Sequence, residues 1–145
     1  MEIPNEDEWG NYKDDLEQEW AYKIFGGKSN DEVQKEFFQN VIERTDELRF
    51  MPVIPFRYYM LGFMKFVMSG NFEICGSSDA ASCFLDLVKE KLSEYPEHIL
   101  PIMEELYPAV EYVAKNQQKY DADLGIYGDF LQIFENISTQ YENAK

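Results

Sequence analysis

Pro55-Phe-Arg-Tyr-Tyr-Met-Leu-Gly-Phe-Met-Lys-Phe-Val-Met-Ser69 is the stretch of sequence that decides the fold, because only Arg57 and Lys65 within it carry charge. Wound as a helix, it presents apolar side chains on nearly every side: Phe56, Tyr59, Met60, Phe63 and Val67 on one, Tyr58, Leu61 and Met68 on others. Such a helix is normally packed on several neighbours. We therefore predict a central core helix over about residues 55–69. Met51 to Met68 is short for a bilayer span and includes both charges, so we expect no membrane segment.

The residues before this helix also follow helical periodicity, with apolar side chains at steps of three and four. A first helix is predicted to end at Gly26-Gly27 and to have an inward face made of Leu16, Trp20 and Ile24. Ser29 and Glu32 have the spacing of a capping box, which predicts the start of a second helix. Its inward residues are Val33, Phe37, Val41 and Leu48. Pro52 and Pro55 separate it from the central helix.

The residues after the central helix continue the same pattern. Ser77 or Ser78 is expected to cap a fourth helix, with an inward face made of Ala81, Phe84, Leu85, Val88 and Leu92. Prolines at 96, 101 and 108 leave open whether the next helical stretch is one helix or two. Asp129 is expected to cap a last helix. The whole pattern predicts an all-α fold, one domain of six or seven helices over residues 1–145, in which residues 1–10 have freedom to move.

Charge is the strongest compositional feature. The chain has 145 residues with 28 Asp and Glu against 13 Lys and Arg, for a formal net charge of −15. Such a charge repels nucleic acid and anionic lipid, so direct binding of DNA, RNA or membrane is not expected. An apolar share of 45% indicates a folded chain. The charge fits either a basic partner or solubility alone, and composition does not choose between them.

The acids gather at the N-terminus, where residues 1–19 have eight acids and one lysine. Aromatic residues lie among them, and tight interfaces combine aromatic anchors with charges that speed encounter. The candidate partner-binding residues are therefore Glu6, Asp7, Glu8, Trp9, Tyr12, Asp14, Asp15, Glu17, Glu19 and Trp20. The competing interpretation is that Leu16 and Trp20 dock the first helix onto the core while the acids face water. Both interpretations remain open from sequence.

Residues that support catalysis or metal binding are scarce. His98 is the only histidine and has no nucleophile near it, so we interpret it as a surface or helix-entry residue. Cys75 and Cys83 lie eight apart, which is not a metal or redox spacing, and Cys83 fits a core position. An EF-hand loop that began at Asp121 would need glycine at its sixth position and glutamate at its twelfth, where this chain has Ile126 and Gln132. Residues 121–129 are therefore predicted to be a solvated turn. We expect no enzyme activity, cofactor or metal.

Three segments resemble a known family: Pro55-Phe-Arg-Tyr-Tyr-Met-Leu-Gly-Phe-Met-Lys-Phe-Val, Ser78-Asp-Ala-Ala-Ser-Cys-Phe-Leu-Asp-Leu-Val and Ile126-Tyr-Gly-Asp-Phe. They are similar to the small helical immunity proteins of contact-dependent growth inhibition systems, over about residues 35–135. The resemblance is closest to those that accompany nuclease toxins, of the ribonuclease kind. It implies a cytoplasmic protein that binds one toxin domain and blocks its active site or substrate groove. It transfers no binding residues.

Charge and resemblance together predict an inhibitor that forms a 1:1 complex with a basic toxin domain. The residues at the N-terminus show neither the basic region nor the apolar region of a secretory signal, and cysteines are few, which favours a cytoplasmic protein. The alternative is an acidic mimic of nucleic acid that inhibits a DNA- or RNA-processing enzyme. An uncharacterised enzyme is the third interpretation, and it would need a pocket of carboxylates around His98.

Overall fold

The computed structural model describes residues 1–145 and contains α-helices and 3-10 helices but no strand. The α-helices are α1 (Leu16–Phe25), α2 (Gln34–Gln39), α3 (Val41–Phe50), α4 (Val53–Ser69), α5 (Ser77–Glu94), α6 (Pro96–Lys115), α7 (Leu124–Tyr127) and α8 (Phe130–Ala144). The 3-10 helices are η1 (Glu6–Trp9), η2 (Tyr12–Asp14) and η3 (Gln117–Tyr120). The predicted all-α fold is confirmed.

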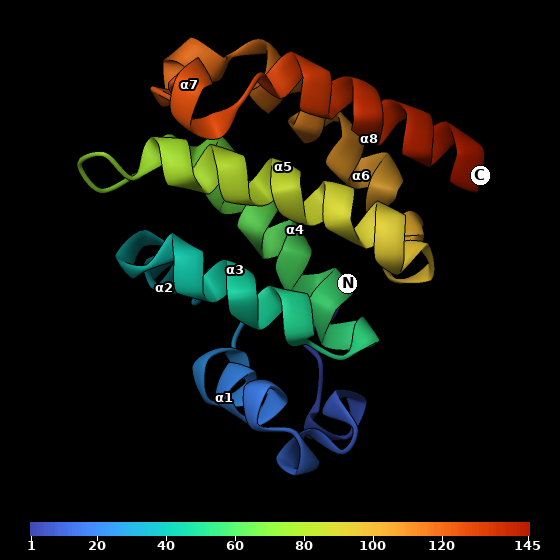
Figure 1. The fold of residues 1–145 in the computed structure, drawn as a ribbon. Helices are drawn as coiled ribbons and strands as arrows, with labels where there is room; N and C mark the ends of the chain where they lie inside the picture. The colour runs from blue at the N-terminus through green and yellow to red at the C-terminus, as the bar shows by residue number, and fades with distance from the viewer.

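The helices are arranged as successive layers (Figure 1). The N-terminal segment with α1 lies at one end of the molecule, and the next layer holds α2 and α3, of which α3 packs against α1. Next comes α5, which packs against α3, α4, α6 and α8, while α8 and α7 lie at the opposite end. All buried apolar side chains form one cluster of 35 residues, so the chain has a single core.

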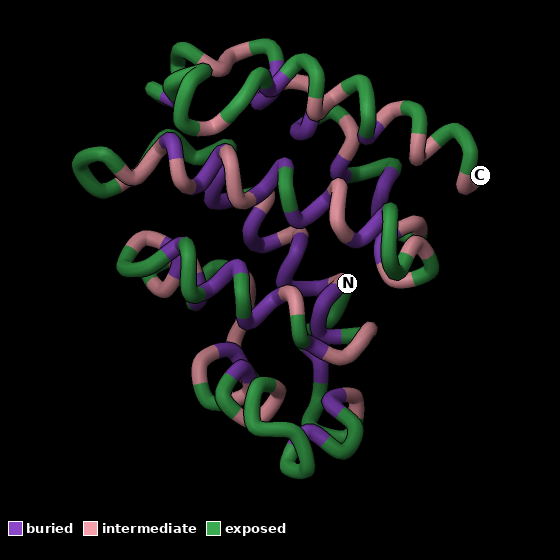
Figure 2. The backbone as a smooth tube through the Cα atoms, viewed as in Figure 1, coloured by how far each residue is buried: buried purple, intermediate pink, exposed green.

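The central helix is α4, and it begins two residues earlier than predicted. Figure 2 shows its backbone coloured as buried over much of its length, between the N-terminal layers and α6. Gly62 allows Asn30 to approach closely, because a Cβ at Gly62 would lie 2.1 Å from Asn30 Oδ1. In that position Asn30 Oδ1 has no hydrogen-bond partner, and Asn30 Nδ2 donates to the Tyr58 carbonyl at 2.9 Å. Tyr59 donates to the carbonyls of Phe25 and Lys28, which ties the end of α1 to α4.

The predicted second helix is divided in the structure. The Ser29 and Glu32 side chains each bond the other's backbone N–H, as a capping box does, but they close a turn, and α2 begins at Gln34. The chain then breaks at Asn40, whose φ of −159° and ψ of 84° are not helical. Asn40 Oδ1 accepts from Glu43 N at 3.2 Å and so caps α3. This break, together with the short α7, gives eight α-helices where six or seven were predicted.

The prolines of the fifth predicted helix do not divide it. Pro96 occupies the first turn of α6, and Pro101 and Pro108 lie inside one continuous helix. Both are exposed, so the carbonyls that lose a partner can lie on the solvent side. The predicted serine cap of α5 is wrong, because Gly76 precedes the helix and gives no side-chain cap. Ser77 Oγ instead donates to the Tyr120 carbonyl, and Ser78 Oγ hydrogen-bonds Tyr127 OH. None of the helices is both long and apolar enough to cross a bilayer.

Candidate functional site

The N-terminal aromatic residues pack inside the protein. Trp9 is 0% exposed and Tyr12 5%. The Trp9 ring meets Tyr22 edge-on at a centroid distance of 5.2 Å, Tyr12 stacks on Tyr22 at 4.3 Å, and Trp9 also contacts Tyr59 of α4. Trp9 and Tyr12 therefore belong to the core and do not offer free surface to a partner. Residues 5–9 form η1 and its cap, with a capping box between Asn5 and Glu8.

The predicted inward face of α1 is wrong at Leu16 and Trp20, whereas Ile24 is partly buried and packs against the core. Leu16 is 87% exposed and Trp20 is 51% exposed, whereas Ala21 and Phe25 are fully buried. The neighbouring stripe of α1 packs inward because it meets the rings of Trp9 and Tyr59. Leu16 therefore does not dock α1 on the core, and Trp20 keeps about half of its surface exposed. Of the sequence-predicted aromatic candidates, Trp20 alone remains on the surface.

A groove lies between α1 and α3, and Trp20 forms part of its lining. Its volume is about 430 Å³, and its lining residues are Leu16, Glu17, Trp20, Glu43, Asp46, Glu47 and Phe50. Leu16, Trp20 and Phe50 are exposed hydrophobic residues. We call this feature the α1–α3 groove. Apolar anchors surrounded by acids are suited to a partner that has apolar and basic side chains.

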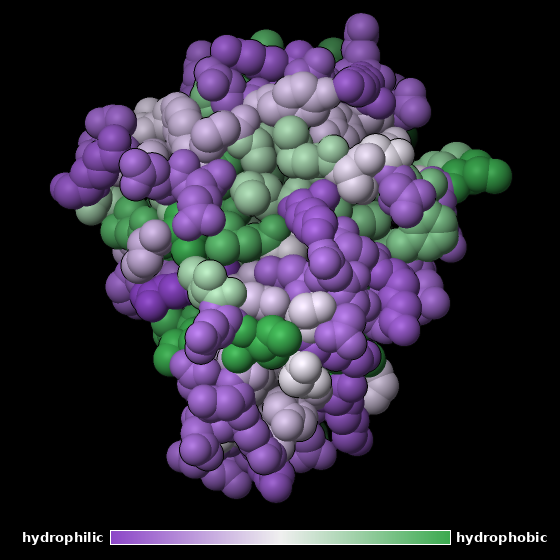
Figure 3. Space-filling view, turned by 180° about the vertical axis from the view of Figure 1, so that it is seen from behind, coloured by the Kyte–Doolittle hydropathy of each residue, from purple (hydrophilic) through white to green (hydrophobic).

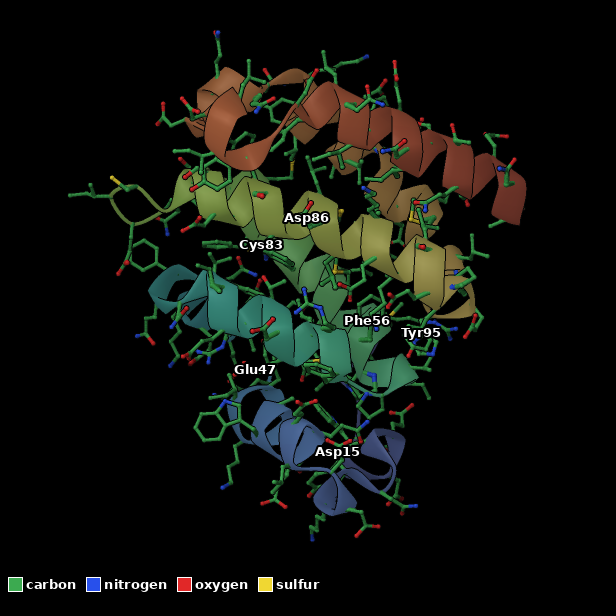
Figure 4. All side chains as sticks on the ribbon, viewed as in Figure 1. Asp15, Glu47, Phe56, Cys83, Asp86 and Tyr95 are labelled. Atoms are coloured by element: carbon green, nitrogen blue, oxygen red, sulfur yellow. The ribbon has the colours of Figure 1, made fainter.

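Glu47 holds the Trp20 indole in place. Trp20 Nε1 donates to Glu47 Oε2 at 2.7 Å, and Arg44 Nε and Nη2 donate to the two Glu47 oxygens at 2.6 and 2.9 Å. Figure 4 shows Glu47 on the side of α3 that faces α1. Glu47 is 6% exposed, and desolvation raises its pKa, while the bonds from Arg44 and Trp20 oppose that rise. The indole is therefore fixed at one edge.

The electrostatics of the α1–α3 groove are negative, because four of its lining residues are acids and none is basic. Arg44 is close by, but it is buried and already paired with Glu36, Glu43 and Glu47. Asp46 pairs with Arg49, whereas Glu17 has no ion pair or side-chain hydrogen bond. The charge of Glu17 therefore remains uncompensated at the rim.

The acids of the N-terminal segment have two kinds of role. Three have local bonds: Glu6 Oε2 accepts from Tyr12 OH at 2.5 Å, Glu8 belongs to the capping box, and Asp15 accepts from two backbone N–H groups to cap α1. The bond to Glu6 is also the main reason that the Tyr12 pKa is raised. The other predicted acids, Asp7, Asp14, Glu17 and Glu19, have no side-chain hydrogen bond or ion pair. No ion pair in the molecule includes an acid from residues 1–19.

These acids give the N-terminal end a hydrophilic surface. Figure 3 shows the molecule from behind, with this end covered mostly by hydrophilic residues and with hydrophobic residues gathered across the middle. A hollow of about 520 Å³ lies beside η1 and η2, and its acids are Glu6, Asp7 and Asp14. Together the hollow and the α1–α3 groove place most of the predicted acids near α1 on accessible surface.

The histidine, the two cysteines and the metal-ligating side chains do not gather into one cluster. His98 is half-buried, stacks on Tyr95, and has a pKa lowered first by burial and then by the Lys91 charge. Burial raises the pKa of Cys83, which is partly buried against the core, and Cys75 is exposed. No three or more His, Cys, Asp or Glu side chains are grouped to hold a metal ion. Asp129 caps α8 as predicted, with Oδ1 accepting from Leu131 N at 3.0 Å.

Sequence reasoning missed the contribution of α3 to the site. Asp46 and Glu47 lie three and four residues after Glu43, the spacings that bring side chains together on one face of a helix. That spacing was a usable signal for an acidic face. Phe50, which follows at another step of three, is the apolar residue of the same face.

No protein-family model matches the chain, and no match was found among curated proteins or among solved structures.

Proposed function

We propose that the protein is an immunity protein that neutralises a basic toxin domain, a nuclease of the ribonuclease kind delivered by neighbouring bacteria. It acts in the cytoplasm without catalysis, in a 1:1 complex that occludes the toxin's active site or substrate groove. The observation that carries this proposal is the α1–α3 groove, where exposed apolar side chains lie beside four acids, of which Glu17 has no ion pair.

The chemistry of nucleases supports the pairing. A nuclease holds a phosphate backbone with Lys and Arg, and those residues attract an acidic inhibitor at long range. Trp20, Leu16 and Phe50 then supply apolar contact, which favours a long-lived complex once the charges have met. The resemblance over residues 35–135 points to the same class of protein.

The first experiment tests the function itself. The protein encoded by the gene just upstream is purified as the candidate toxin, and its nuclease activity is measured with and without this protein. We expect stoichiometric inhibition and a 1:1 complex by size-exclusion chromatography with light scattering. Full nuclease activity at excess protein contradicts the proposal.

The second experiment tests the surface. An N-terminal variant carries Asp7→Asn, Asp14→Asn, Glu17→Gln and Glu19→Gln, which removes the charge of Glu17 in the groove and of three acids near it and spares the acids with local bonds. A matched control carries Glu94→Gln, Glu104→Gln, Glu105→Gln and Glu135→Gln, four exposed acids on α5, α6 and α8. Each variant changes the net charge from −15 to −11.

Electrostatic steering predicts different outcomes for the two variants. The association rate of the N-terminal variant should fall about tenfold at low salt, and that of the control should change much less. The wild-type rate should itself fall as salt rises. Equal slowing of both variants would mean that only the net charge matters, and the assigned surface would then be wrong.

A further inference from the structure

Trp20 and Trp9 are the two tryptophans of the chain, and only Trp20 is exposed. The bond to Glu47 holds the Trp20 indole by its nitrogen edge, so ring rotation is restricted while half of the side chain stays accessible. The face of this ring already attracts a cation, because Lys23 Nζ of the same helix lies 6.0 Å from the ring centroid. A fixed, exposed indole in a negative groove is a suitable platform for a cation.

We infer that the α1–α3 groove is a binding site for an arginine side chain of the partner. The guanidinium lies on the Trp20 ring and donates hydrogen bonds to rim carboxylates, of which Glu17 and Glu43 come from different helices. Leu16 and Phe50 contact the aliphatic part of the arginine. This inference rests on the proposed function in one respect, namely that the partner is a basic protein.

The arrangement of the carboxylates favours arginine over lysine. A guanidinium is planar, stacks on aromatic rings and presents five donors, whereas an ammonium is a compact charge with a stronger hold on water. Glu17 has no competing partner, and Glu43 is exposed and engages Arg44 only through Oε2. Glu47 is different, because both of its oxygens already accept bonds. It therefore acts as a positioning residue for the indole and does not itself need to touch the arginine.

A change at Lys23 tests whether the Trp20 ring binds a cation, because the inference predicts tighter arginine binding and not weaker. Because its ammonium lies near the Trp20 ring, removing it should free the ring and strengthen arginine binding. Lys119→Gln is a matched control, since Lys119 is exposed, lies over the Tyr112 ring and carries the same charge. Lys23→Gln should tighten binding at least about threefold more than Lys119→Gln does.

The experiment uses the full chain and three capped tripeptides, Gly-Arg-Gly, Gly-Lys-Gly and Gly-citrulline-Gly. Citrulline has nearly the shape of arginine without its charge. Each peptide is titrated into isotope-labelled protein, and the indole N–H signals of Trp20 and Trp9 are followed by NMR, with assignment from Trp20→Phe. We expect the arginine peptide to move the Trp20 signal saturably and the Trp9 signal little. Lysine and citrulline peptides should bind at least about threefold more weakly.

Substitutions at Glu17 and Glu43 test whether the rim carboxylates bind the arginine. Glu17→Gln combined with Glu43→Gln should weaken the arginine peptide at least about threefold, while the control pair Glu104→Gln and Glu105→Gln should not. Equal binding of the arginine and lysine peptides, or no saturable shift of Trp20, overturns the inference.

The two proposals fail in different ways. If Trp20→Leu inhibits the toxin with unchanged affinity, the arginine site is wrong and the immunity function stands. If the wild-type protein fails to inhibit the nuclease, the proposed function is wrong, and the peptide titration still decides whether the groove recognises arginine.

Discussion

Trp20 Nε1 donates a hydrogen bond to Glu47 Oε2 at 2.7 Å, and this bond joins α1 to α3 at the groove. Glu47 is at the same time paired with the buried Arg44. An exposed aromatic side chain that is already fixed loses little conformational freedom when a partner covers it. The same hydrogen bond therefore stabilises the packing of α1 on α3 and holds the Trp20 ring in a fixed orientation in the groove.

Glu47→Ala should destabilise the protein strongly. It leaves the Arg44 guanidinium buried with only the more distant Glu36 and the exposed Glu43, and removing one member of a buried pair typically costs about 3–5 kcal/mol. Trp20→Phe loses one hydrogen bond and should cost about 1 kcal/mol. Urea denaturation followed by circular dichroism measures both. A Glu47→Ala cost as small as that of Trp20→Phe would contradict this account.

The two tryptophans should differ in their contribution to folding. Trp9→Ala removes a fully buried ring that Tyr12, Tyr22 and Tyr59 surround, and it should cost about 3–5 kcal/mol. Trp20→Ala removes a half-exposed ring and should cost about 1–2 kcal/mol. The comparison is made by the free energy of unfolding in urea. Similar costs would mean that Trp9 is not part of the core.

The sequence predicted α4 well because a helix that is apolar on all sides needs no choice of face. For α1 a choice was needed, since Leu16 and Trp20 form one stripe at helical spacing and Ala21 and Phe25 form the adjacent one. Residues far away in sequence, above all Tyr59, decide which stripe packs inward. Local periodicity contains no information about them.

The site was predicted only in part for the same reason. The acids beside α1 were visible as a charge cluster, but the groove also requires α3, and its distance from α1 is set by tertiary packing. The break at Asn40 was equally hard to see, because no proline or glycine marks it. Asn40 ends one helix and caps the next through its side chain.

Gly62→Ala should destabilise the junction between Asn30 and α4. The new Cβ would lie 2.1 Å from Asn30 Oδ1, so Asn30 must move and lose its bond to the Tyr58 carbonyl. Overpacking of this kind costs about 1–3 kcal/mol. In an Asn30→Ala background the same substitution should cost clearly less, because the clashing amide is absent. Equal costs in the two backgrounds, measured by thermal denaturation, would show that the contact is not the cause.

The two thiols should react at different rates. Cys75 is exposed, whereas Cys83 is partly buried and its pKa is raised by desolvation, which lowers its thiolate fraction. A chromogenic disulfide reagent should therefore modify one thiol quickly and the second slowly in the native protein. Cys75→Ser should remove the fast phase and Cys83→Ser the slow one. Loss of the fast phase in Cys83→Ser would reverse the assignment.

His98 should make the protein less stable in mild acid. Its pKa is lowered from 6.5, first by burial, then by the charge of Lys91, with Arg57 acting in the same direction and Glu97 opposing. Its Nδ1 is buried with no hydrogen-bond partner, so a proton there would be an unpaired donor. A histidine with a lowered pKa binds its proton more readily in the unfolded chain. Its contribution to stability is therefore complete above pH 6.5 and is lost as the pH falls through the folded-state pKa.

The check is direct because His98 is the only histidine. Its ring proton signal, titrated by NMR, should have a midpoint below 6.5. The free energy of unfolding of the wild type minus that of His98→Gln should decline between pH 7.5 and pH 5. Taking this difference removes the effect of the carboxylates, which titrate in both proteins. A midpoint at or above 6.5, or a difference that grows toward acid, would mean that the Glu97 carboxylate, 3.8 Å from Nε2, outweighs burial.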